Sequence, residues 1–163
     1  MTNYTKPVKF NIVLNSQYSS IGTNNNNLSY DFNWTNIPRG AYMMSYTYRG
    51  LNNGNFIADD SPQIFLSLGS VPSVYEPNTI ARSIVSNYIG TLRAETHAAA
   101  QVYFYSNIHD NPSVYYENIP SSGPITVQIF DSNFTVPFTM IGGGNIDPYI
   151  LVLSFERVHG CDC

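Results

Sequence analysis

The residue types that most often carry out catalysis are sparse in this chain and well separated. Its three histidines are His97, His109 and His159. A metalloenzyme of the cupin kind needs two closely spaced histidines, a glutamate a few residues later and a third histidine further on. His97 has no second histidine within two residues, so this pattern is absent. A lone histidine in a β-protein is more often a surface or hydrogen-bonded residue.

Three other arrangements that could support chemistry also fall short. Adjacent carboxylates at Asp59 and Asp60 point in different directions in an extended chain, which disfavours a calcium site. The glycines at 142–144 lack the lysine and the serine or threonine of a phosphate-binding loop. No serine lies in a Gly-x-Ser-x-Gly elbow. We therefore predict no enzyme activity, no metal and no cofactor.

The two cysteines, Cys161 and Cys163, lie at the C-terminal end, which excludes a framework of internal disulfides. A zinc site usually needs four ligands with wider paired spacing, so these two cysteines with His159 match it poorly. We interpret residues 159–163 as a frayed tail with free thiols, and a disulfide to a neighbouring subunit is the alternative. Both cysteines are candidate contact residues.

Composition indicates a surface that is suited to packing against other subunits. Charged residues make up 11% of the 163 residues, against about 25% in an average soluble protein. Aromatic residues reach 14% and include 13 tyrosines. Interface cores are depleted in charge and enriched in aromatic residues. An ordinary tyrosine-rich β-sandwich would have the same composition.

Charge and hydropathy limit the partners further. The net charge is −4 and the seven lysines and arginines are scattered, so we expect no nucleic-acid binding. No run approaches the roughly 18 apolar residues of a membrane span. The N-terminus shows no basic and then apolar signal pattern, so we expect the chain to be made and kept in the cytoplasm.

Alternation of apolar and polar residues predicts a series of short strands. Residues 107–124 hold three prolines and predict a long connection, whereas residues 80–92 fit either a helical turn or a strand. Near the C-terminus, Ile150 and Val152 make one strand apolar on both faces, as expected where a second sheet or a neighbouring chain covers it. The predicted strands lie in residues 8–15, 28–34, 41–49, 63–68, 98–106 and in three runs within 123–158.

About eight or nine short strands without a convincing long helix predict an all-β sandwich or barrel. Eight strands in two antiparallel sheets is the count of a single jelly roll. An immunoglobulin-type sandwich fits the strand lengths but needs only about 100 residues and carries a Cys-Trp-Cys signature that is absent here. We predict one jelly-roll domain at residues 1–158, followed by the tail at 159–163.

One region resembles a known family. It runs from Asn111-Pro112-Ser113-Val114-Tyr115 through Ile125-Thr126-Val127-Gln128 to the apolar strand that ends in Phe155-Glu156. This is similar to the C-terminal half of the single jelly-roll penton and minor capsid proteins of large eukaryotic double-stranded DNA viruses and virophages. The resemblance implies a structural protein of the virion, assembled in the host cytoplasm. Its implied partners are four further copies in a fivefold ring and the neighbouring major or minor capsid proteins.

The alternative is a carbohydrate-binding β-sandwich, such as a viral spike head or a lectin-like domain. Exposed aromatic rings would then stack on a glycan, while asparagine or acidic side chains would bond its hydroxyl groups. The best candidates are Tyr115 and Tyr116, beside Glu117 and Asn118. The competing interpretation of these two tyrosines is that they pack beneath a long loop.

Overall fold

A computed structural model describes most of the chain. The described residues are 8–20, 22, 25–50, 61–69, 88–97, 102–107, 113–133, 146 and 148–158. The predicted strand at 134–141 and the segment 80–87 lie outside them, as does the tail. Among the described residues, no helix is long and apolar enough to cross a membrane.

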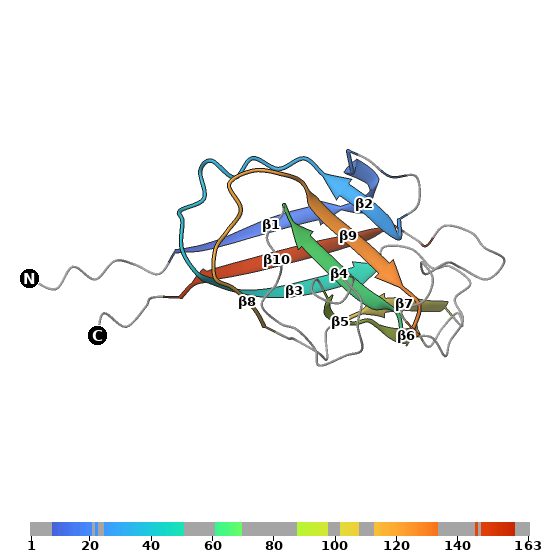
Figure 1. Cartoon of the computed structure of the whole chain (residues 1–163). Coiled ribbons are helices and arrows are strands. Elements are labelled where there is room, and N and C mark those ends of the chain that lie inside the picture. The colour runs from blue at the N-terminus through green and yellow to red at the C-terminus, as the bar shows by residue number, and fades with distance from the viewer. Residues whose placement is uncertain are drawn as a thin grey trace, which may run out of the picture.

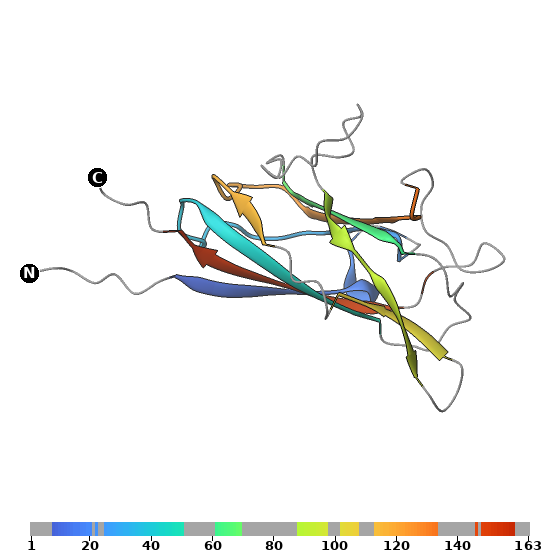
Figure 2. The same ribbon diagram turned by 90° about the horizontal axis from the view of Figure 1, so that it is seen from below.

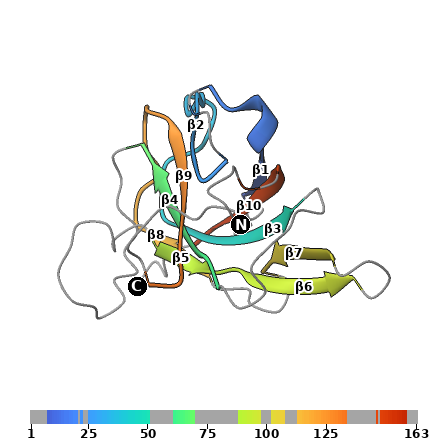
Figure 3. The same cartoon turned by 90° about the vertical axis from the view of Figure 1, so that its right-hand side faces the viewer.

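The described residues form two antiparallel sheets that pack as a sandwich, which confirms the predicted all-β class (Figure 1; Figure 2). The larger sheet has six strands in the order β1-β10-β3-β7-β6, with β8 paired to β3 as well (Figure 3). Its strands are β1 (Lys9–Asn15), β10 (Tyr149–Arg157), β3 (Tyr42–Gly50), β7 (Val102–Ser106), β6 (Arg93–His97) and β8 (Val114–Tyr116). The smaller sheet has the order β2-β9-β4-β5, with β2 (Asn27–Tyr30), β9 (Ile125–Phe130), β4 (Gln63–Leu68) and β5 (Tyr88–Thr91).

The strand pairs are nested along the chain. β1 pairs with β10, β2 with β9, β3 with both β7 and β8, and β4 with β5. Successive pairs alternate between the two sheets, so the chain crosses from one sheet to the other after β1, after β2 and after β3. The chain returns between β5 and β6, where only Leu92 separates the two strands.

The core lies between the sheets because strand residues alternate between the two faces. In β10, Leu151 and Leu153 are fully buried on the inner face, whereas Ile150 and Val152 are half-buried on the other. Ile64 and Leu66 of β4, in the smaller sheet, belong to the same core as Leu151 and Leu153. The second sheet covers the inner face of β10, whereas cover of its other face by a neighbouring chain stays a prediction.

The structure differs from the predicted strands at two points. The strand predicted at 28–34 ends at Tyr30, which lies opposite Ile125, the first residue of its partner strand β9. The alternation of apolar and polar residues continues beyond the strand, because the side chain of Trp34 is also buried in the core. The long connection predicted at 107–124 contains the short strand β8, and η1 (Ser16–Tyr18), a single 3-10 turn, follows β1.

Candidate functional site

Among the described residues, no three histidine, cysteine, aspartate or glutamate side chains gather closely enough to hold a metal ion. His97 lies in β6. The other residues considered for chemistry lie outside the described residues: His109, His159, Cys161, Cys163, the Asp59–Asp60 pair and the glycines at 142–144.

The two tyrosines proposed as a stacking platform point to opposite sides of β8. Tyr116 is fully buried, with its ring 6.3 Å from that of Phe155, and burial raises the pKa of its hydroxyl. Tyr115 is 37% exposed and lies opposite Met43 of β3. Tyr116 packs in the core between the sheets, so of the two tyrosines only Tyr115 is available to a partner.

Tyr115 belongs to a broad surface on the larger sheet that faces away from the core. We call this surface the outer face. Strand register places its residues in rows across β1, β10 and β3, such as Val13, Val152 and Thr47, or Asn11, Ser154 and Ser45. Val13 is 64% exposed, which is unusual for a valine. The outer face comprises Lys9, Asn11, Val13, Met43, Ser45, Thr47, Arg49, Tyr115, Ile150, Val152, Ser154 and Glu156.

Charge on the outer face is confined to its ends. Lys9 Nζ lies 2.9 Å from a carboxylate oxygen of Glu156, and each side chain is more than half exposed. An exposed pair of this kind adds little to stability. The pair neutralises the two charges at this end, and Arg49 carries the charge at the other end. The middle of the face carries only hydroxyl, amide and apolar groups. Such a surface has a small desolvation free energy when another protein covers it.

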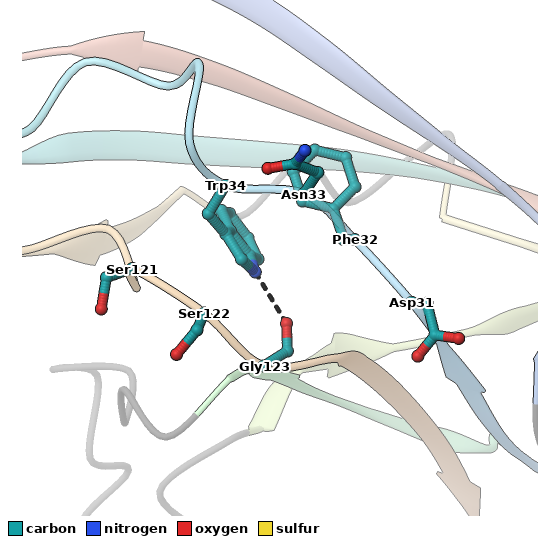
Figure 4. A pocket seen from close by; sticks show the side chains of 7 residues that line it. All are labelled: Asp31, Phe32, Asn33, Trp34, Ser121, Ser122 and Gly123. Carbon is teal, nitrogen blue, oxygen red and sulfur yellow. Dashed lines mark hydrogen bonds between the residues drawn. The ribbon is translucent and has the colours of Figure 1, made fainter.

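A second candidate is a hollow of about 450 Å³ at the end of the smaller sheet (Figure 4). It lies between the segment that follows β2 and the loop that precedes β9, and it is lined by Asp31, Phe32, Asn33, Trp34, Ser121, Ser122 and Gly123. The indole N–H of Trp34 donates a 2.8 Å hydrogen bond to the Gly123 carbonyl. Phe32 packs edge-on against the indole, with 4.6 Å between the ring centroids.

The side chains that line this hollow are suited to binding a neutral polar ligand. Asp31 supplies a carboxylate, and Ser121 and Ser122 supply hydroxyl groups, all on exposed residues. Trp34 is only 3% exposed, so its indole shapes the wall and cannot stack on a ligand. The half-buried ring of Phe32 is the aromatic group that remains. Sequence patterns do not predict this hollow, because its two sides are about 90 residues apart and meet only through sheet pairing.

Comparison with known proteins adds no assignment. No protein-family model matches the chain, and no curated protein matches its sequence.

Proposed function

We propose that this chain is a structural protein of an icosahedral viral capsid. In this proposal it is a single jelly roll that forms the fivefold penton ring at the vertices and contacts the surrounding capsomers. Assembly takes place in the host cytoplasm, and the mature location is the virion. The proposal starts from the resemblance of residues 111–158 to capsid proteins and is supported by two features of the structure.

The observation that carries the proposal is the nested strand order. Four antiparallel pairs, from β1 with β10 inward to β4 with β5, alternate between two facing sheets. A long hairpin that is rolled up on itself gives this alternation, and a jelly roll is such a double-sheet arrangement of eight strands. The strands β6 and β7 then form an added hairpin at the edge of the larger sheet.

The outer face supports a role in assembly. Val13, Val152 and Ile150 lie on three neighbouring positions of β1 and β10, away from the core. Apolar groups at a surface with little net charge favour contact with another subunit. A closed ring of five copies needs two different complementary patches on each copy, and the outer face is a candidate for one of them.

Native mass spectrometry of the purified chain tests the proposal. We expect a stable assembly whose mass is a multiple of five copies, and density for the chain at the fivefold axes of a purified particle. A monomer at every protein concentration would contradict the ring, as would density at any other position of the particle.

Carbohydrate binding is the second candidate, and the hollow beside Asp31 is the observation that favours it. A carboxylate accepts hydrogen bonds from sugar hydroxyl groups, while the Phe32 ring can cover an apolar sugar face. An NMR titration with a panel of neutral oligosaccharides tests this role. Saturable shifts at Phe32 that disappear in Asp31→Ala and persist in Asn11→Ala would support it. No shift with any sugar of the panel would rule it out.

A further inference from the structure

Among the described residues, no strand pairs with the outward edge of β1. The backbone N–H of Arg157 donates to the Val8 carbonyl over 2.9 Å, so Val8 and Arg157 form a hydrogen-bonded pair. Such pairs recur at every second residue of an antiparallel ladder. The register from Lys9 opposite Glu156 to Asn15 opposite Ile150 has no irregularity. Phe10, Ile12 and Leu14 therefore bond to β10, and the N–H and C=O groups of the residues between them point away from the sheet.

The groups that point away from the sheet belong to Lys9, Asn11, Val13 and Asn15. In the described part of the chain, no backbone hydrogen bond reaches the N–H or C=O of Lys9, Asn11 or Val13 from this side. The side chains of these three residues are exposed on the outer face. Figure 3 shows β1 at the end of the larger sheet opposite β6.

In the described part of the chain, the other sheet edges lie at β2, β5, β6 and β8, and each carries a feature that opposes pairing with another chain. β8 has only three residues. β2 and β5 have only four residues each, and the pairing of β5 with β4 contains a register shift. β6 has five residues, among them Arg93 and Glu95. Short length, irregular register and charge all protect an edge against strand addition. β1 has seven residues, no proline, no irregularity and one charge, which Glu156 neutralises.

We infer that the open edge of β1 pairs with the β1 strand of a second copy of this chain. Antiparallel pairing centred on Ile12 would set Asn11 of each copy opposite Val13 of the other, and Lys9 opposite Asn15. All four are residues whose backbone groups point outward, as a hydrogen-bonded ladder requires. No like charges face each other in this register, so the strand is complementary to itself.

This contact relates two copies by a twofold axis and makes one continuous sheet from two larger sheets. It is different from the contacts within a fivefold ring, which join two unlike patches. The inference does not rest on the proposed capsid function.

The variant Asn11→Pro tests the contact. Proline removes the outward N–H of residue 11 and leaves every β1–β10 hydrogen bond in place, and proline is tolerated at such an edge position. The matched control is Asn11→Ala, which changes the side chain and keeps the N–H. We expect native mass spectrometry to show even-numbered assemblies for the wild type and for Asn11→Ala. Asn11→Pro should show half that mass. An identical mass in all three proteins would overturn the inference.

Amide hydrogen exchange followed by NMR provides a measurement that needs no variant. We expect the amides of Asn11 and Val13 to be protected at high protein concentration and to exchange freely on dilution, while those of Ile12 and Leu14 stay protected throughout. Free exchange of Asn11 and Val13 at every concentration would overturn the inference. If the wild type and Asn11→Pro both have the mass of the same multiple of five copies, the ring is supported and the β1 contact is excluded. If the wild type is a dimer and Asn11→Pro is a monomer, the β1 contact is supported and the ring is excluded.

Discussion

At the scale of single residues, the side chain of Asn107 takes the place of a missing piece of strand. β7 pairs with β3 only at Arg49 opposite Ser106, so β3 lacks a backbone partner just beyond this point. The Asn107 side-chain carbonyl accepts from the Tyr48 N–H, and its amide donates to the Tyr46 carbonyl, both over 2.6 Å. Asn107 is buried, so water cannot replace these bonds.

We expect Asn107→Ala to lower the free energy of unfolding by about 2 to 4 kcal/mol, because it leaves two buried backbone groups without these partners. Chemical denaturation followed by circular dichroism measures the change. Asn11→Ala, at an exposed position of β1, is the control and should cost less than about 0.5 kcal/mol. Equal losses in the two variants would show that the Asn107 amide does not support β3.

Buried tyrosines make the fold sensitive to alkali. Burial raises the pKa of Tyr30 from 10.0 to about 12, and it raises the pKa values of Tyr116 and Tyr149 too. The hydroxyls of Tyr30 and Tyr149 interact, but the pair does not meet hydrogen-bond geometry. A tyrosine with a raised pKa in the folded state loses its proton first in the unfolded chain. Rising pH therefore favours unfolding above the ordinary tyrosine pKa.

We expect the free energy of unfolding to be steady below about pH 9 and to fall from about pH 10 upward, by as much as about 1.4 kcal/mol per pH unit for each such tyrosine. Urea denaturation at a series of pH values measures this slope. The absorbance of tyrosinate from the buried tyrosines should rise over the same pH range in which the chain unfolds. Unchanged stability up to about pH 12 would contradict the burial of these hydroxyls.

At the scale of elements, two glycines let the loop before β9 approach the end of β4. Gly69 donates its N–H to the Pro124 carbonyl over 2.7 Å. Gly123 has a φ of +97°, and a Cβ atom there would lie 2.9 Å from the Gly69 Cα. The same Gly123 accepts the indole N–H of Trp34, so this contact also fixes the wall of the hollow.

We expect Gly123→Ala to lower the free energy of unfolding by about 1 to 3 kcal/mol, because alanine is strained at this φ and its methyl group meets backbone. The single tryptophan of the chain, Trp34, reports on the site through its fluorescence. Ser122→Ala is the control, since that side chain is exposed in the same loop. If both variants keep the wild-type stability and emission, the close approach is not required.

At the scale of the whole molecule, the two sheets present different outer surfaces. On the smaller sheet, Phe65 points away from the core yet is only 1% exposed, because Tyr88 and Phe130 pack against it edge-on. That side is closed by its own aromatic residues. On the larger sheet, Val13 and the neighbouring valine Val152 carry no such cover from described residues. Contact between copies is therefore expected through the larger sheet.

We expect Val152→Lys to abolish the fivefold ring and to change the stability of the isolated chain by less than about 1 kcal/mol, because the side chain faces outward. Gln128→Lys is the matched control, since it is a half-buried position on the outer side of the central strand β9. Native mass spectrometry compares the two. A mass that stays a multiple of five in Val152→Lys would show that the outer face is not an interface within the ring.

Local pattern determined much of the fold. Alternation with a period of two is a property of each segment alone, and it placed the strands at 9–15, 42–50, 63–68, 125–130 and 149–157 close to their observed bounds. It also separated the inward Leu151 and Leu153 from the outward Ile150 and Val152. The single jelly roll, the capsid and the ring of five copies remain predictions.

Only the tertiary structure decided which strands are partners and which faces are open. The sequence made Tyr115 and Tyr116 joint candidates for contact with a ligand, but sheet pairing buries Tyr116 and leaves Tyr115 exposed. The sequence pattern does not predict the contact between Trp34 and Gly123, and it does not predict that β1 is an edge strand. The physical reason is that alternation sets the two sides of a strand, whereas register and neighbours depend on contacts between residues far apart in the chain.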